Sequence, residues 1–259
     1  MSIKLNKLVG MALILAVIYS IAVAARIDVY KSNRLLAGSI FTQECAFHYY
    51  FTKLIAKNGT LLAVDFRIQF PEGFKTDKSE SMFMEYFAGY IYRIFLKFAD
   101  FDRFINFFVI IFSSLSALAV FLIAKELFKN NIAAFFSGIF YAVSWPAVAR
   151  TMGFVYLKEN FALPIIFFQI YFFIKYLKSG KKLNIIISSL LFILALASWH
   201  FTRFYFLTIA LYAFLNIAFF EDRVFSKGFT FLALAGMLAS FVISFLRDGA
   251  FFISYPMCL

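Results

Sequence analysis

The chain has 259 residues, 63% of them hydrophobic and 22% aromatic, and carries a formal net charge of +11. A soluble domain of this length does not need so much apolar surface, so the composition indicates a membrane protein. The positive charge does not indicate a nucleic-acid partner. Lys and Arg lie mostly between the apolar stretches, where they set orientation and meet anionic lipid.

Seven stretches are apolar enough to be read as crossing ~30 Å of hydrocarbon: 8–25, 104–124, 132–149, 154–177, 183–199, 201–220 and 228–246. The first follows Lys4 and Lys7 and is expected to be a retained signal anchor. We predict an all-α fold, a polytopic bundle forming a single transmembrane domain over 1–259, with no C-terminal soluble domain. The expected location is the cell membrane, with several passes.

An eighth apolar stretch, 82–98, either spans or lies flat at the interface. The positive-inside rule favours the second alternative. If 82–98 does not span and the N-terminus is cytoplasmic, three charged connectors also lie in the cytoplasm: 125–131, 178–182 and 221–227. The sequence therefore predicts an interfacial helix within a long, structured external loop, 26–103.

Four polar clusters fall on the outer side of this topology. In the first, Glu44 and His48 share a face if the segment is helical. A carboxylate and an imidazole on one face can bind a divalent cation, or recognise a phosphate through it. A solvated helix with a local Glu–His hydrogen bond is the alternative. In the second cluster, Asp65 is followed by a Pro71-Glu72-Gly73 turn, and Asp65 and Arg67 can also form an ordinary surface pair.

The third cluster, Arg150 to Asn160, lies between the third and fourth spans, and Gly153 fits a break between helices. Glu159, near the end of a span, is costly unless paired or hydrated and is therefore a functional candidate. Glu159 and Asn160 both offer oxygen ligands suited to Mg²⁺ or Mn²⁺.

The fourth cluster follows Trp199, a residue common at membrane interfaces. His200 and Arg203 can meet a phosphate group, Arg203 as a bidentate donor.

The order of these motifs resembles the N-terminal membrane region of the archaeal-type catalytic subunit of oligosaccharyltransferase, a C-type glycosyltransferase. The likeness rests on Glu44-Cys-Ala-Phe-His48-Tyr49-Tyr50, Gly59, Asp65, Phe70-Pro71-Glu72-Gly73, Arg150, Gly153, Glu159 and Ser198-Trp199. The chain departs from the family pattern in having Glu44 where Asp is usual and Leu157 where a second acid is usual. It also lacks the family's later spans and its sequon-reading domain.

The resemblance implies transfer of a glycan from a polyprenyl-phosphate carrier to an Asn of an acceptor polypeptide at the outer membrane face. Glu44 and Glu159 would be catalytic and would hold a divalent metal, Mg²⁺ or Mn²⁺. Substrate contacts would come from five further residues: His48, Asp65, Arg150, His200 and Arg203. The expected partners are a lipid-linked sugar donor, the acceptor polypeptide and membrane lipid.

Two other functions stay open. One is a glycosyltransferase that uses a polyprenyl-phosphate monosugar, such as a mannosyltransferase. The other is a non-enzymatic transport or structural membrane protein, which predicts ionisable groups near mid-membrane and inverted repeats. The sequence shows neither feature clearly.

Overall fold

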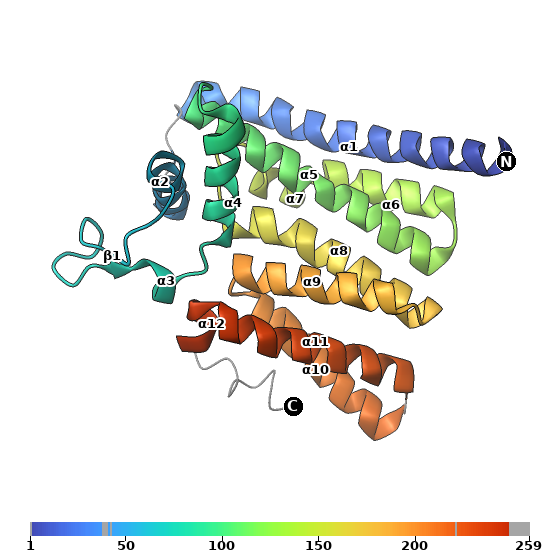
Figure 1. Ribbon diagram of the computed structural model, residues 1–259. Helices are drawn as coiled ribbons and strands as arrows, with labels where there is room; N and C mark the ends of the chain where they lie inside the picture. Colours follow the sequence, from blue (N-terminus) through green and yellow to red (C-terminus); the bar gives the residue numbers. More distant parts are fainter. Residues whose placement is uncertain (1, 38–40, 42, 221, 249–259) are drawn as a thin grey trace. The chain divides into compact units, whose positions relative to one another are not determined.

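The computed structural model describes residues 2–37, 41, 43–220 and 222–248 (Figure 1). It is 81% helical, which confirms the all-α prediction. The chain divides into two compact units, one formed by Met1–Tyr50 and Leu96–Phe167, the other by Phe51–Phe95 and Phe168–Leu259. Each unit is described separately below.

Helices correspond to all seven predicted spans. Within the described residues, five contain segments long and apolar enough to cross a bilayer: α1 (Ser2–Ala37), α5 (Phe101–Phe128), α8 (Lys158–Ser179), α10 (Thr202–Phe219) and α11 (Arg223–Val242). The other two predicted spans are shorter apolar helices, α6 (Asn131–Val143) and α9 (Lys182–Ser198). Many large apolar side chains point outward, including Leu13 at 61% and Phe140 at 69% exposure. Lipid rather than water is the natural solvent for such a surface.

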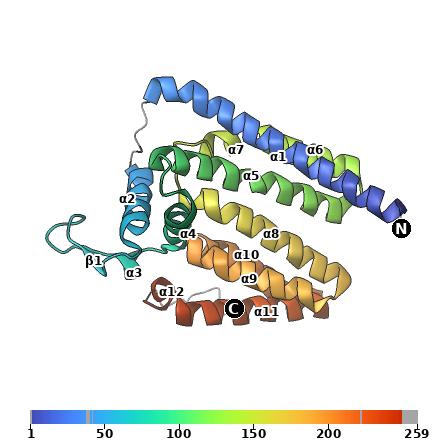
Figure 2. The same ribbon diagram turned by 45° about the horizontal axis from the view of Figure 1, so that its top comes forward.

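In the first unit, α1, α5 and α6 pack lengthwise against one another (Figure 2). Small residues let their backbones approach, as is usual between membrane helices. Ala22, Ala117 and Ala134 are fully buried. A Cβ added to Gly138 would lie 3.1 Å from Ile18 Cδ1 and 3.3 Å from the Ala117 carbonyl oxygen.

Two boundaries in this unit differ from the prediction. The first helix does not end at residue 25 but continues to Ala37, because no Gly or Pro interrupts the chain between Gly10 and Gly38. The third predicted span, 132–149, is broken: α6 ends at Val143 and a separate helix, α7 (Trp145–Arg150), follows. Pro146 has no N–H to continue the hydrogen-bond ladder of α6.

The second unit packs α9, α10 and α11 around a core that includes Phe192, Phe206 and Leu232. The short helix α12 (Ser244–Asp248) follows α11 and contacts α3 (Thr76–Ser79). The outer loop also carries a two-stranded hairpin, in which β1 (Val64–Asp65) pairs antiparallel with β2 (Phe74–Lys75). Gly73 has φ +74°, as the Pro-Glu-Gly turn predicted.

The stretch 82–98 forms α4 (Phe83–Ile91), continued by a π-helical segment, Tyr92–Leu96. It is not among the candidate spans. Figures 1 and 2 show α4 at an angle to α9, which it contacts, rather than parallel to it. Aromatic and aliphatic side chains on this segment are exposed, with Phe95 at 75%. These features support the predicted interfacial helix.

Candidate functional site

The first predicted cluster lies at the start of α2 (Gln43–Asn58), where Glu44 occupies the first turn. The segment is helical as predicted, and Glu44 and His48 share a face, with Glu44 Oε1 3.5 Å from His48 Nε2. The side chain of Glu44 is 67% exposed, whereas that of His48 is 2% exposed. The carboxylate is therefore accessible to a ligand, and the imidazole lies beneath it in the protein.

The third cluster brings a second acid to a similar place, the first turn of α8. Arg150 donates to one oxygen of Glu159: Nε lies 2.9 Å and Nη2 2.7 Å from Oε1. Because the N-terminus of a helix carries partial positive charge, it favours a nearby carboxylate. Glu44 and Glu159 thus share the same kind of electrostatic support.

The turn between α7 and α8 joins Arg150 to Glu159. Gly153 lies in this turn, as predicted from its sequence context. A Cβ at Gly153 would lie only 2.6 Å from Tyr30 Cδ2 and 3.1 Å from Asn106 Cβ, so the backbone approaches α1 and α5 as closely as only glycine permits. The side-chain amide of Asn160 donates to the carbonyl of Val155 and closes the turn.

Cys45 and His48 place α2 against the turn between α7 and α8. Burial raises the pKa of the Cys45 thiol, a hydrogen bond from the Tyr156 backbone acts in the opposite direction, and the negative charges of Glu44 and Glu159 raise it further. The charges of both carboxylates thus act in the same direction on the Cys45 thiol. Tyr156, which is fully buried, makes an edge contact with His48, with ring centroids 6.5 Å apart. Residues far apart along the chain meet here within the first unit.

The two segments carry oxygen donors of the kind that a divalent cation needs. Glu44, Glu159 and Asn160 supply oxygens of the kind that Mg²⁺ and Mn²⁺ prefer. In the described part of the chain, Asn160 Oδ1 is buried without a hydrogen-bond partner. There, too, no three His, Cys, Asp or Glu side chains form a metal-binding group by themselves. Because Mg²⁺ usually keeps several waters beside one or two carboxylates, the chemistry of these donors suits such an ion, and its binding by Glu44 and Glu159 stays a prediction.

Sequence reasoning missed Asp102, in the first turn of α5. Its carboxylate accepts a short hydrogen bond from the hydroxyl of Tyr49, which ties α2 to α5 within the first unit. The available signal was the position of Asp102 at the start of an apolar stretch, two residues after Asp100. Asp100 caps α5 by accepting from the Arg103 amide at 2.8 Å.

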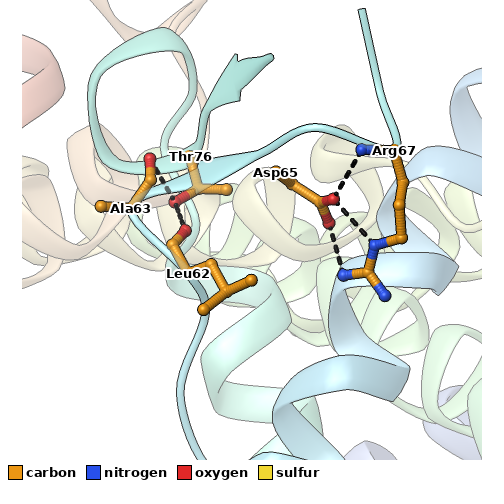
Figure 3. A network of polar contacts seen from close by, with 5 residues as sticks. All are labelled: Leu62, Ala63, Asp65, Arg67 and Thr76. Atoms are coloured by element: carbon orange, nitrogen blue, oxygen red, sulfur yellow. Dashed lines mark hydrogen bonds and ion pairs between the residues drawn. The ribbon is translucent and has the colours of Figure 1, made fainter. Parts of the chain in front are cut away.

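Asp65, by contrast, belongs to the second unit and is held by its own loop (Figure 3). Its carboxylate accepts from Arg67 Nε at 2.9 Å, from Nη2 at 2.8 Å and from the Arg67 backbone amide at 3.0 Å. Beside it, Thr76 Oγ1 donates to the Leu62 carbonyl at 2.6 Å. These contacts close the hairpin, and they favour a structural role for Asp65. Its predicted contact with substrate remains untested.

The fourth cluster also lies in the second unit. His200 is exposed in the turn between α9 and α10. The Arg203 guanidinium carbon lies 4.6 Å from the centroid of the Phe245 ring. Phe245 lines a cavity of about 320 Å³, whose wall also includes Glu80 and Tyr86. Arg203 therefore packs behind one wall of a cavity that can take an organic ligand.

The fold is that of a helical integral membrane protein in which Glu44 and Glu159 each lie in the first turn of a helix. The sequence model of a protein family described as Dpy19, Q-cell neuroblast polarisation, matches residues 15–259. The chain belongs to the Dpy19 family and is thus a membrane glycosyltransferase-like protein of the C type. A comparison with curated proteins finds no match.

This family assignment supports the C-type class that the sequence indicated but not the narrower resemblance. The match is to Dpy19, and it gives no specific support for the oligosaccharyltransferase catalytic subunit. A lipid-linked donor and an acceptor in the membrane follow from the class.

Proposed function

We propose that this protein transfers a single sugar, mannose, from a polyprenyl-phosphate donor to a carbon atom of an acceptor polypeptide at the outer membrane face. The packing of α2 on the turn before Glu159 carries the proposal, because the edge contact of His48 with Tyr156 joins the segment of Glu44 to that of Glu159. The Dpy19 match supports C-mannosyl transfer in particular. It favours the monosugar alternative over transfer of a whole glycan to Asn.

The reaction breaks the bond between the anomeric carbon and the phosphate oxygen, and the polyprenyl phosphate leaves with the electron pair. A new carbon–carbon bond forms to the acceptor. The indole of Trp is the most electron-rich aromatic side chain and is therefore the natural carbon nucleophile. The ring carbon that is attacked loses its proton, so a base must accept this proton.

Glu44 is proposed to be that base, because its carboxylate is exposed at the start of α2, where an acceptor can reach it. Glu159 sits beside Arg150, whose guanidinium can turn to the leaving phosphate as a bidentate donor. His48 supports Glu44, and a divalent cation held by Glu44 and Glu159 would supply charge to offset the developing charge on the phosphate.

His200 and Arg203 are proposed to bind a phosphate-bearing or peptide substrate at the second unit. The cavity behind Phe245 supports this role. We also propose that the N-terminus is cytoplasmic, because the excess of Lys and Arg in the connectors then lies inside. Cysteine labelling from each side of sealed vesicles tests this orientation.

The decisive experiment incubates the full chain, in lipid nanodiscs, with radiolabelled polyprenyl-phosphate mannose and two acceptor peptides. One peptide contains Trp and lacks Asn, and the other contains an Asn-x-Thr sequon and lacks Trp. We expect label in the Trp peptide, in a form that resists acid hydrolysis because the linkage is carbon–carbon. Label in the sequon peptide alone would support the oligosaccharyltransferase-like alternative. Absence of transfer to either would contradict the proposal.

The variants E44Q and E159Q remove one charge each with little change in shape. Both are expected to lower transfer about 1,000-fold or more, the scale of losing a group that acts in the transition state. E72Q makes the same change at an exposed outer-loop position and should keep wild-type activity. Chelation with EDTA, followed by addition of Mg²⁺ or Mn²⁺, tests the cation separately.

A further inference from the structure

Arg26 is a buried cation in the last two turns of the apolar segment Val9–Ser32 of α1. None of its surface is exposed. Among the described residues it forms no ion pair with a carboxylate. A buried ionisable group in an apolar segment is costly, the more so because Nη2 has no hydrogen-bond partner among the described residues, and it is a functional candidate by default. The mechanism above makes no use of it.

The guanidinium of Arg26 bridges three elements. Nε donates to Thr151 Oγ1 at 2.7 Å, and Nη1 donates to the carbonyl oxygens of Ala22 at 2.9 Å and Ala142 at 3.3 Å. The Ala142 carbonyl needs a donor because Pro146, four residues later, has no N–H to give. The fixed planar fork of Arg reaches these acceptors together, which the single ammonium of Lys does not do equally well.

Arg26 binds the turn that carries Arg150, the ion-pair partner of Glu159. Thr151 directly follows Arg150, and the turn continues to Glu159 at the start of α8. A second contact fixes the same turn on α1: the rings of Tyr30 and Phe154 lie 4.8 Å apart. The close packing of Gly153 on Tyr30 adds a third.

We infer that Arg26 is a positioning residue, which sets the Arg150–Glu159 pair by clamping Thr151. The inference rests on the proposed function only for its effect on transfer, because the clamp itself can be measured without substrate. Arg26 does not touch the reacting atoms. It acts through the backbone of the turn, where a displacement of about 1 Å can cost roughly 100-fold in rate.

Hydrogen exchange of residues 150–160, measured by mass spectrometry on the full chain in nanodiscs, tests the clamp. R26M removes the donors but keeps the length. T151V keeps the shape but removes the hydroxyl, which accepts from Arg26 and donates to the Ala147 carbonyl. We expect both to speed exchange in this segment at least about tenfold, with the other helices unchanged. T151S keeps the hydroxyl and should keep the protection. S137A, which removes a hydroxyl bonded only within α6 as far as the described contacts show, is the matched control.

The same variants are tested for transfer from polyprenyl-phosphate mannose to the Trp peptide. R26M and T151V should lower kcat roughly 10- to 100-fold and change KM for the donor less than about twofold. R26K should recover part of the loss. Wild-type exchange in both R26M and T151V would overturn the inference, and so would faster exchange throughout the chain. If the wild-type chain transfers no sugar, the proposed function fails, but the exchange result still decides on the clamp.

Discussion

The two units each contain an Arg–carboxylate pair, and the pairs are built differently. Asp65 in the second unit is 3% exposed and receives three hydrogen bonds from Arg67, one of them from the backbone, on both carboxylate oxygens. Glu159 in the first unit is 20% exposed, and both contacts from Arg150 go to Oε1. Both oxygens of the Asp65 carboxylate accept hydrogen bonds from its own loop, whereas Glu159 has one oxygen that Arg150 does not bind. The same two residue types thus close a hairpin in one place and form an accessible acidic site in the other.

The largest contrast is expected in activity. E159Q should lose transfer almost completely while its melting temperature in nanodiscs stays within about 2 °C of the wild type, since a partly exposed ion pair contributes little stability. Transfer to the Trp peptide and thermal unfolding are measured on the same preparation. Normal turnover in E159Q would remove Glu159 from the site.

D65N should show the reverse behaviour. It loses the charge-assisted hydrogen bonds of a buried carboxylate, while Arg67 is 59% exposed and stays solvated, so the expected cost is about 1–3 kcal/mol in the unfolding of the loop. Limited proteolysis of the loop and thermal unfolding report this loss. Transfer should fall only in proportion to the folded fraction. A drop in kcat without a stability change would instead assign Asp65 to substrate.

A glycine substitution tests how tightly the first unit holds its turn. G153A places a Cβ 2.6 Å from Tyr30 Cδ2, so the turn must move, at a cost of about 1–3 kcal/mol. Transfer should fall with it. G10A is the matched control, because a Cβ there meets nothing within 4 Å and Ala is the better helix former.

The smallest effect concerns Cys45. A raised pKa leaves less thiolate at a given pH, so removing a nearby negative charge lowers that pKa and increases the thiolate fraction. E44Q and E159Q should each speed alkylation of Cys45 by iodoacetamide at pH 8 by about two- to fivefold, relative to E72Q. An effect of E44Q alone would argue that Glu159 is not near Cys45.

The fold was predictable to the extent that hydropathy governs it. Each of the seven predicted apolar spans contains helix in the described residues. The shared helix face of Glu44 and His48 followed from their i, i+4 spacing. The break of α6 at Ser144 was missed, although Pro146 was a visible signal. Hydropathy is averaged over many residues, so one proline in an apolar stretch changes it very little.

The site was predictable only in part. The functional roles of Glu44 and Glu159 stay predictions. For Asp65 the sequence left open a substrate contact and an ordinary pair with Arg67, and the structure contains the pair. Arg26 was overlooked because the first span was ended one residue before it. Its role depends on Thr151 and Ala142, more than 100 residues away, and no local pattern reveals such partners.

The shortness of α6 has a consequence for the bilayer itself. Its 13 residues rise about 20 Å, roughly 10 Å less than the thickness of a typical hydrocarbon layer. Where α6 crosses the bilayer, either the lipid beside it is thinner, or the polar backbone around Ser144 and the start of α7 completes the crossing. Local thinning of this kind would bring the phosphate of a long-chain isoprenoid closer to the protein. The sugar that it carries would then not have to leave the membrane.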